Sequence, residues 1–250
     1  MSPRLAHIVR HPIKAVGHEE LTEAALIPGA ALPFDRVWAV AHAGAKFGPD
    51  LADWAAKMNF LRGVSGPELM AIAAQSDPAT RRVALSHPRA GRLSVAPDAA
   101  EDAARLLAWL APLWPEGRLP PAFVACPGRA LTDVPEPYVS LLNLASNRLL
   151  SERMGQDLSI HRWRGNLWLD GLDPFAEFDL IAREIAIGAA RLRIETRITR
   201  CKATTVNPAT GAADADTLGT LRAHWGHEDF GVYARVLDGG TIRLGDTVTL

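Results

Sequence analysis

A succession of short apolar runs, each closed by turn-forming residues, constrains the fold of this chain more than any other feature. Between residues 68 and 97 the runs ELMAIAAQ, RRVALSH and GRLSVAP are separated by SDPAT and PRA. Runs of this length bounded by Pro, Gly, Asp and Ser are typical of strands. We therefore expect an antiparallel meander here, with further strands in the N-terminal stretches LAHIV and RVWAVAH.

One amphipathic helix is predicted directly after this meander. Asp98 is placed to cap it, with Glu101 three residues later, which is the spacing of a capping box. Large apolar residues then recur at helical spacing, so we expect them to pack against the sheet. These residues are Leu106, Trp109, Leu110 and Leu113.

Two shorter helices are predicted in the second half of the chain. The first covers 144–154 and ends at Gly155, and the second covers 217–225 and ends at Gly226, because glycine commonly terminates helices. The stretch 118–138 is rich in proline and lacks periodicity. We expect it to be a long crossing segment.

The last third returns to strands. Gly188 is at the centre of IAIGAARLRI, which predicts a tight hairpin, and Asp-Gly-Gly at 238–240 predicts a closing hairpin. Strands dominate both ends of the chain, and closed barrels are a common solution for many short strands. The expected fold class is mostly β (α+β), with two β-barrel domains and a few helices.

Composition excludes several functional classes. The chain has 250 residues and a formal net charge of −1, so it has no global basic field for nucleic acid. Its N-terminus lacks the apolar segment of a signal peptide, and no apolar run approaches the roughly 18 residues that a membrane helix needs. We expect a soluble, cytoplasmic protein with neither nucleic acid nor membrane as partner. Cys126 and Cys201 are expected to be free.

Cys201 has two possible roles. A cysteine in a strand-rich segment is often a buried apolar filler. However, Arg200 and Lys202 flank it, and basic neighbours favour the thiolate that metals and electrophiles require. The following NPATG predicts a turn, which would place the cysteine at the start of a loop.

Several basic residues are candidates for holding an oxyanion. Lys14, Arg36, Arg162 and Arg164 could each be a surface charge, or could grip a phosphate. The sequence has no glycine-rich phosphate loop, so scattered side chains would have to hold a phosphate. His224 and His227 could clip a metal, but no third ligand is near them in the sequence.

Taken in order, three stretches resemble the MOSC domain: RWRGNLWLDGLDPFAEFD, IAIGAARLRIETRITRCKATTVNPATG and FGVYARVLDGGTIRLGDTVTL. The N-terminal stretch HIVRHPIKAVG, with the later LPFDRVWAV, looks like the β-barrel domain that precedes MOSC in such proteins. The resemblance implies an N-terminal domain over 1–97, a helix and linker over 98–129, and a MOSC domain over 130–250.

The resemblance also implies a site for the molybdenum cofactor, that is, molybdenum bound to molybdopterin. Cys201 matches the cysteine that binds molybdenum in amidoxime-reducing members, and a soft thiolate suits that metal. Asn207 is assigned a catalytic position, although those members usually have Asp there, and Ala15 stands where many have Ser. The residues assigned to cofactor binding are Lys14, Arg36, Asn143, Arg162, Arg164, Asn166, Arg200, Thr205 and Tyr233.

The leading functional hypothesis is a molybdenum-dependent oxidoreductase that reduces N-hydroxylated compounds or N-/S-oxides. Its electrons would come from a separate ferredoxin, cytochrome or flavin reductase. One alternative is a non-enzymatic carrier or insertion protein for the cofactor, and another is a sulfur carrier that uses a persulfide on Cys201. We expect the cofactor in the cleft between the two domains, because Lys14 and Arg36 come from one side and Cys201 from the other.

Overall fold

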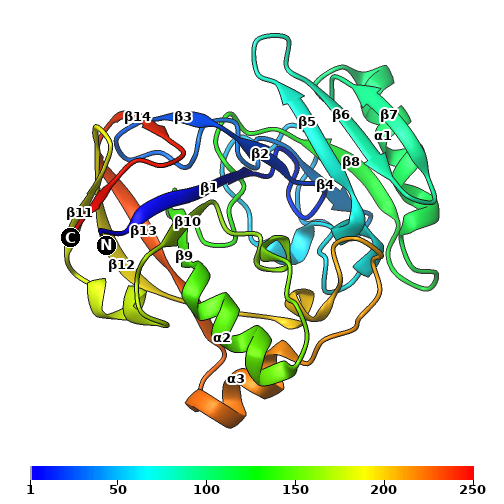
Figure 1. The fold of residues 1–250 in the computed structure, drawn as a ribbon. Helices are drawn as coiled ribbons and strands as arrows, with labels where there is room; N and C mark the ends of the chain where they lie inside the picture. The colour runs from blue at the N-terminus through cyan, green and yellow to red at the C-terminus, as the bar shows by residue number, and fades with distance from the viewer. Residues whose placement is uncertain (1) are drawn as a thin grey trace.

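The structure, a computed structural model, describes residues 2–250 and is organised around one large sheet (Figure 1). Eight strands form it in the order β15-β11-β12-β13-β9-β10-β1-β2. Neighbouring strands are antiparallel except for β9 and β10, which are parallel. The strands are β1 (Arg4–Arg10), β2 (Glu19–Leu21), β9 (Val139–Asn143), β10 (Leu167–Asp170), β11 (Glu184–Ile187), β12 (Ala190–Thr199), β13 (Asp229–Asp238) and β15 (Val248–Thr249).

The sheet encloses the main apolar core. Buried and exposed residues alternate along the first part of β12, as expected when one face of a strand meets the core and the other meets solvent. Leu, Ile and Val side chains from β1, β9, β10, β12 and β13 fill the interior. The expectation of a mostly β (α+β) fold is confirmed.

The two ends of the large sheet approach each other without forming a closed barrel. The Leu5 amide donates to the Asp246 carbonyl at 2.9 Å, and the Val248 amide donates to the Pro3 carbonyl at 2.8 Å. These bonds join the start of β1 to the chain around β15, and both termini lie at this end of the molecule (Figure 1). Among residues 2–250, neither the large sheet nor the three-stranded sheet has its first and last strands paired with each other. The prediction of closed barrels is therefore wrong.

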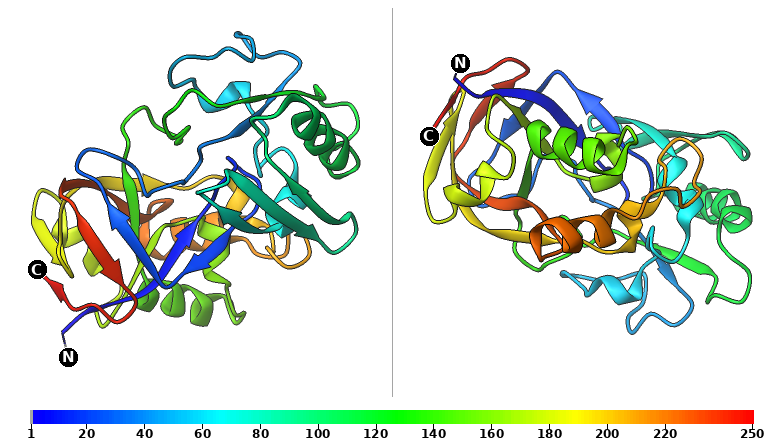
Figure 2. Two further views of the ribbon diagram at one scale, coloured as in Figure 1. Left: turned by 90° about the horizontal axis from the view of Figure 1, so that it is seen from above. Right: turned by 60° about the horizontal axis from the view of Figure 1, so that its bottom comes forward.

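Two smaller sheets and one helix form the other half of the molecule, and a third small sheet, β14-β3, packs against the core of the large sheet. The meander β5-β6-β7 forms as predicted, and α1 packs against β7 and β8 (Figure 2). A further strand, β8, pairs with β4 inside the segment predicted to be a long crossing connection. The bounds are β3 (Glu23–Leu26), β4 (Ala39–His42), β5 (Ala73–Asp77), β6 (Arg82–His87), β7 (Gly91–Val95), β8 (Pro121–Ala125), β14 (Gly240–Arg243) and α1 (Ala100–Leu110).

The helix α1 buries the predicted face but has a different start. Leu106, Leu110 and Leu113 are buried, and Trp109 is partly buried against the same cluster. The predicted cap at Asp98 is wrong, because the N-cap residue is Ala99 and makes no side-chain cap. The Asp98 carboxylate instead accepts the Trp38 indole N–H at 2.8 Å and two bonds from Arg81.

The predicted closing hairpin is also wrong. β13 pairs with β12 and β9, whereas β14 leaves the large sheet and pairs with β3. The crossing is tight, since a Cβ added at Gly240 would lie 2.8 Å from the Ala189 carbonyl carbon, and one at Gly239 would lie 2.7 Å from the Leu26 oxygen. The two glycines therefore permit close passage over neighbouring backbone instead of a two-strand turn. The predicted hairpin at Gly188 does form, between β11 and β12.

The two shorter helices have the predicted bounds. They are α2 (Leu144–Met154), with Gly155 as C-cap, and α3 (Thr217–Trp225), with Gly226 as C-cap. They lie side by side on one side of the large sheet, in green and orange in Figure 2. Within the described part of the chain, none of the helices is both long and apolar enough to cross a membrane.

Candidate functional site: a cationic cavity at Cys201

A cavity of about 620 Å³ lies where segments from both halves of the chain meet, and we call it the Cys201 cavity. Lys14 and Arg36 line it from the N-terminal part, and Cys201 and Tyr233 line it from the C-terminal part. The other lining segments are 57–64, 132–140, 162–166 and 196–204. Residues that are far apart in the sequence therefore face one space.

The wall of this cavity is strongly cationic. Eight of the lining side chains are Lys or Arg, and two are carboxylates, although the whole chain has a formal net charge of −1. A concave site lined by one sign of charge concentrates ligands of the opposite sign. The basic residues are Lys14, Arg36, Lys57, Arg62, Arg162, Arg164, Arg197 and Arg200.

Three residues in the wall have left-handed backbone conformations. The φ angles are 61° at Ala15, 52° at Arg36 and 49° at Arg164. Non-glycine residues adopt this region at a cost, and they concentrate at ligand-binding sites where the surrounding structure enforces it. Both arginines lie in turns and line the cavity.

Lys14 lines the cavity and is only 3% exposed. Its ammonium group donates to the Leu131 carbonyl at 2.8 Å and to the Asp133 carboxylate. Burial lowers the pKa of Lys14, and the nearby Asp133 opposes that shift. Burial acts to raise the pKa of Asp133, but Lys14 and then Arg36 outweigh it, so that this carboxyl is ionised at neutral pH.

Arg36 is paired with the buried carboxylate of Asp35. Asp35 accepts from the Arg36 guanidinium and, at 2.7 Å, from the His11 backbone amide. Burial alone would raise the pKa of Asp35, but Arg36 and the bonds to His11 leave it lowered. Arg36 also donates to the Arg164 carbonyl at 3.1 Å, which joins the N-terminal part of the wall to the 162–166 segment.

Arg162 and Arg164 carry buried donors without partners. Arg162 is 2% exposed, and its Nε and Nη1 atoms have no hydrogen-bond partner among residues 2–250. The same holds for Nη2 of Arg164 in the described structure, whereas its Nη1 donates to the Gly17 carbonyl at 3.1 Å. Burial and the charge of Arg36 lower the pKa of Arg164 to about 9, which leaves it charged at neutral pH. Buried polar atoms are normally paired, so these donors point to an anionic ligand.

Arg200 has a structural role beside Cys201. It donates to the Phe230 carbonyl at 2.7 Å through Nε and to the Trp163 carbonyl at 2.8 Å through Nη1. Burial lowers the pKa of Arg200 to about 10. These bonds to backbone carbonyls hold Arg200 in place, and with it the neighbouring Cys201.

Cys201 stands exposed at the start of the short 3-10 helix η6 (Lys202–Thr205) and lines the cavity. The alternative that it is a buried apolar filler is therefore wrong. Cys126 lies elsewhere, half-buried beside Arg81. Both cysteines are free, as expected.

The structure brings most of the predicted site residues to this cavity and places three elsewhere. Asn143 is buried at the start of α2, where its amide donates to Glu177 at 2.9 Å. The Thr205 hydroxyl donates to the Lys202 carbonyl, and the Asn207 amide donates to Asp214. Those that line the cavity are Lys14, Arg36, Arg162, Arg164, Asn166, Arg200, Cys201 and Tyr233.

Asn166 and Tyr233 contribute in different ways. Asn166 accepts from the Ser140 hydroxyl at 2.8 Å and donates to the Val9 carbonyl at 3.1 Å, so it ties β1, β9 and the 162–166 segment together. Tyr233 stacks on Tyr138 with ring centroids 5.4 Å apart. Burial raises the pKa of Tyr233, so its hydroxyl keeps its proton at neutral pH.

Sequence reasoning missed several lining residues. Lys57 begins the short 3-10 helix η1 (Lys57–Asn59), Arg62 follows that helix, and Asp133 lies in the proline-rich crossing segment. No local motif marks them. They reach the cavity because the segments 57–64 and 132–140 fold over it.

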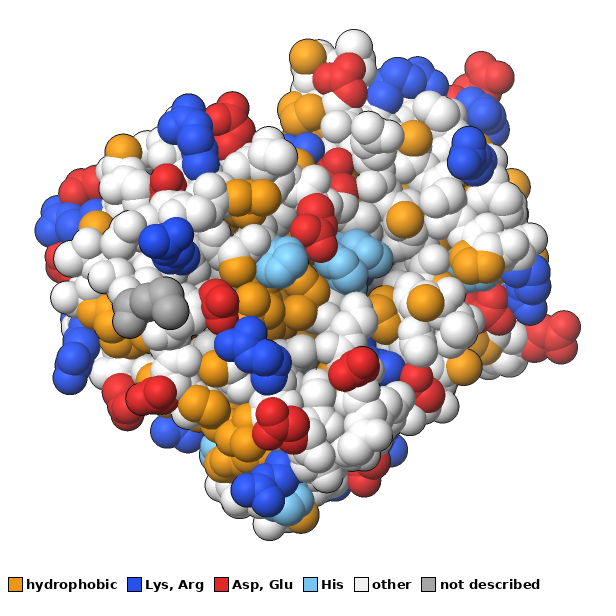
Figure 3. All heavy atoms as spheres, viewed as in Figure 1, with side chains coloured by type: hydrophobic (Ala, Val, Ile, Leu, Met, Phe, Trp, Pro, Cys, Tyr) orange, Lys and Arg blue, Asp and Glu red, His pale blue; other side chains and the backbone are white. Residues whose placement is uncertain are grey.

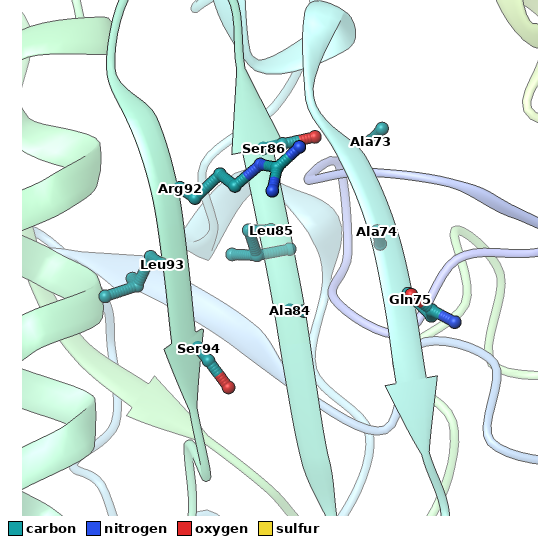
Figure 4. Close-up of a pocket in the computed structure, with 9 residues that line it drawn as sticks. All are labelled: Ala73, Ala74, Gln75, Ala84, Leu85, Ser86, Arg92, Leu93 and Ser94. Atoms are coloured by element: carbon teal, nitrogen blue, oxygen red, sulfur yellow. The ribbon is translucent and has the colours of Figure 1, made fainter.

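A second hollow, of about 520 Å³, lies on the face of the meander (Figure 4). Small and apolar side chains of β5, β6 and β7 line it, and Arg92 is the charged residue among the described lining side chains. It lacks the thiol and the group of cations that distinguish the Cys201 cavity. We therefore assign the candidate site to the Cys201 cavity.

A stacked histidine pair adjoins the segment that carries Arg162 and Arg164. The His18 and His161 rings are stacked with centroids 3.9 Å apart, and His161 Nε2 lies 3.2 Å from a Glu20 oxygen. Figure 3 shows histidine side chains grouped near the middle of one face. Burial, followed by the proximity of His161, lowers the pKa of His18 to about 3.

This pair predicts a loss of stability in mild acid. The folded pKa of His18 is below the unfolded value near 6.5, so below pH 6.5 the unfolded chain binds more protons and stability falls as pH falls. Between pH 7 and pH 5 we expect His18 to account for about 2 kcal/mol of lost unfolding free energy. Urea unfolding at both pH values, on the wild type and His18→Phe, measures this difference.

The exposed His224 provides the matched control, since His224→Gln should lose as much stability as the wild type over the same interval. Equal losses in wild type and His18→Phe would contradict the prediction.

The C-terminal half of the chain is similar to known proteins. Residues 129–249 match the MOSC domain family. The chain is 31% identical over 117 residues to the molybdenum cofactor sulfurase of Anopheles gambiae, covering 42% of this chain and 15% of that protein. It is 33% identical over 122 residues to mitochondrial amidoxime-reducing component 1 of Xenopus laevis, covering 44% of this chain and 35% of that protein.

A likeness to one solved structure extends over both halves. The YUAD protein of Bacillus subtilis superposes with a TM-score of 0.47 at 11% sequence identity, covering 99% of this chain and 94% of that chain. The aligned region spans well under two thirds of the two curated relatives. The similarity to the MOSC domain family therefore covers residues 129–249 of this chain.

Proposed function

We propose that this chain binds the molybdenum cofactor in the Cys201 cavity and reduces N-hydroxylated compounds or N-/S-oxides there. The observation that carries the proposal is the cavity itself, in which one exposed thiol faces a wall with eight Lys and Arg side chains. The names of the relatives, a molybdenum cofactor sulfurase and an amidoxime-reducing component, support the choice of cofactor.

The donor set of the cavity fits such a group. No group of three or more His, Cys, Asp and Glu side chains that could hold a metal occurs within residues 2–250. A metal at Cys201 would therefore receive its other ligands from a non-protein group, as a pterin dithiolene provides. A terminal phosphate would suit the unpartnered donors of Arg162 and Arg164.

In this proposal each part of the wall has a chemical task. Cys201 would supply the soft thiolate ligand, and Lys14, Arg36, Arg162 and Arg164 would hold the anionic end. The bound cofactor supplies two-electron oxygen-atom transfer. The hydrophobic rings of Tyr138 and Tyr233 would shield the substrate from water.

The overall conversion of an N-hydroxylated substrate consumes two electrons and two protons, as R–NHOH + 2 e⁻ + 2 H⁺ gives R–NH₂ + H₂O. Tyr233, whose pKa is raised by burial, holds a proton at the cavity wall at neutral pH. We propose a separate ferredoxin, cytochrome or flavin reductase as the electron source, because two cysteines are too few for a four-cysteine iron–sulfur cluster.

A carrier or insertion protein is the second candidate. Histidine is absent from the described residues that line the cavity, and Asn207, assigned a catalytic position, is bonded to Asp214 outside it. These features favour binding over proton-transfer chemistry. The Cys201 thiol is also exposed, so its sulfur is accessible for a persulfide, as the sulfur-carrier alternative requires.

Metal and pterin analysis of protein freshly purified from a cofactor-producing host tests the proposal. We expect about one molybdenum and one pterin per chain, with reduction of a model amidoxime or sulfoxide by artificial electron donors. Cofactor without reduction would support the carrier. Absence of both molybdenum and pterin would overturn both, and a mass increase of one sulfur at Cys201 would then indicate the sulfur carrier.

A further inference from the structure

We infer that Asp214 and Asn207 are positioning residues that aim the Arg162 guanidinium at an oxyanion in the Cys201 cavity. This inference rests on the proposed function for the identity of the ligand, but the contacts that carry it are those of the chain itself. Neither residue lines the cavity, so both would act through Arg162.

Arg162 is the best-buried cation of the wall, and only one side of it is paired. Its Nη2 atom lies 2.7 Å from Oδ1 of Asp214. Its Nε and Nη1 atoms have no partner among the described residues. A guanidinium presents its N–H groups in a rigid planar fork. Once Asp214 anchors one edge, the direction of the remaining donors is set.

Asn207 in turn orients Asp214. Its Nδ2 atom donates to Oδ2 of Asp214 at 2.7 Å, and its Oδ1 atom accepts from the Ala209 amide at 2.8 Å. The bond from Ala209 decides which end of the Asn207 amide is oxygen, and so the N–H₂ end must face the carboxylate. The two Asp214 oxygens therefore have different partners, Arg162 and Asn207.

The backbone of this loop is fixed as well. The Asn207 amide donates to the Ala212 carbonyl at 2.8 Å, the Gly211 amide donates to the Asn207 carbonyl at 2.8 Å, and the Asp214 amide donates to the Thr205 carbonyl at 3.0 Å. The loop thus returns Asp214 to η6, directly after Cys201. Thiol and guanidinium are held by the same short segment.

This arrangement explains why a carboxamide and not a carboxylate suits position 207. Aspartate there would set two carboxylates in hydrogen-bond contact, and like charges at that distance repel. It would also leave the Ala209 amide as the only defined donor to that side chain. Asn207→Asp should therefore displace Asp214 and release Arg162.

The ligand of Arg162 is an oxyanion, either the phosphate of the cofactor or an anionic group of the substrate. The probe for the site is inorganic phosphate, titrated by calorimetry into cofactor-free protein. Molybdenum and pterin content of protein from a cofactor-producing host, and KM for anionic against neutral substrates, then distinguish the two sources.

We expect Asp214→Asn to weaken phosphate binding by about three- to tenfold, because an unanchored side chain must be immobilised on binding. A purely electrostatic role requires the opposite, since removing a carboxylate beside a cation would tighten anion binding. Tighter binding by Asp214→Asn would overturn the inference.

The exchange of the two side chains provides the rescue. Asn207→Asp should weaken phosphate binding by roughly tenfold, and the double variant Asn207→Asp/Asp214→Asn should return to within about threefold of wild type, since a carboxylate–amide pair is restored. The control Asn207→Asp/Asp157→Asn has the same net charge, but its second change is at an exposed residue in another loop. Restored phosphate binding in this control would overturn the inference. So would a lack of rescue in the exchange variant, provided that this variant unfolds at the wild-type temperature.

Arg162→Lys, with the loop intact, covers the case in which an exchange variant does not fold. It should lose affinity for phosphate, because an ammonium lacks the rigid planar fork with which a guanidinium bonds Asp214 along one edge and an oxyanion along another. Unchanged affinity would contradict the inference. If phosphate binding follows these expectations but the protein never contains molybdenum, the proposed function fails and the inference stands.

If molybdenum content falls together with phosphate affinity, the cofactor supplies the oxyanion. If content is constant while KM rises for anionic substrates alone, the substrate supplies it. Either pattern supports the positioning role of Asp214 and Asn207.

Discussion

Cys201→Ser is expected to lower the molybdenum content of the purified protein by roughly tenfold or more, with a parallel loss of the proposed reductase activity. Losing even an outer-shell partner of a metal typically costs 10- to 100-fold in affinity or activity, and here the replaced group is the proposed ligand. A serine hydroxyl is a harder and less readily ionised donor than a thiol. Elemental analysis and reduction of a model amidoxime measure the two effects.

The second cysteine provides a matched control. Cys126 is half-buried beside Arg81 and outside the lining of the Cys201 cavity. Cys126→Ser should therefore retain wild-type molybdenum and activity. Equal molybdenum in Cys201→Ser and the wild type would exclude Cys201 as a ligand.

Trp163→Ala is expected to lower the free energy of unfolding by about 3–5 kcal/mol. Trp163 is 1% exposed, and its indole stacks on Phe230 with ring centroids 3.8 Å apart. Its Nε1 atom donates to Oδ1 of Asn147 at 2.7 Å. The change leaves a large cavity between α2 and the large sheet and an unpaired amide oxygen, and urea unfolding at pH 7 measures the loss.

Trp163→Phe separates the two contributions. It keeps an aromatic ring against Phe230 but removes the indole donor, so we expect a loss of about 1–3 kcal/mol, the range for a buried group left unsatisfied. Trp163 lies between Arg162 and Arg164 and its carbonyl accepts from Arg200. A Trp163→Ala protein as stable as the wild type would mean that this segment does not depend on the indole.

Helix ends and local hairpins could be predicted because their determinants are adjacent in the chain. Gly155 and Gly226 end α2 and α3 as expected, and the turn at Gly188 joins neighbouring strands. The predicted closing hairpin does not form because β14 pairs with β3, which lies near the other end of the sequence. Asp98 does not cap α1 because its carboxylate accepts hydrogen bonds from Trp38 and Arg81, which lie outside this helix.

The candidate site likewise contains residues that could be predicted from the sequence and residues that could not. Cys201, Lys14, Arg36 and Arg164 could be singled out by residue type and by resemblance to MOSC proteins, and the structure places all four on one cavity. Asn143 could not be separated from them in that way, because its amide is used inside the fold by Glu177. Lys57 and Arg62 could not be found, since nothing near them in the chain marks them as facing a cavity.

By itself, the sequence determined that the chain is rich in short strands, that it has two cysteines, one of them between basic residues, and that its charges nearly balance. Only the tertiary structure decided that eight cations share one wall with Cys201, and that Asn207 serves Asp214 and Arg162. The physical reason is that strand character and helix ends depend on neighbouring residues. The approach of Lys14 to Cys201 depends instead on the register of strands from opposite ends of the chain.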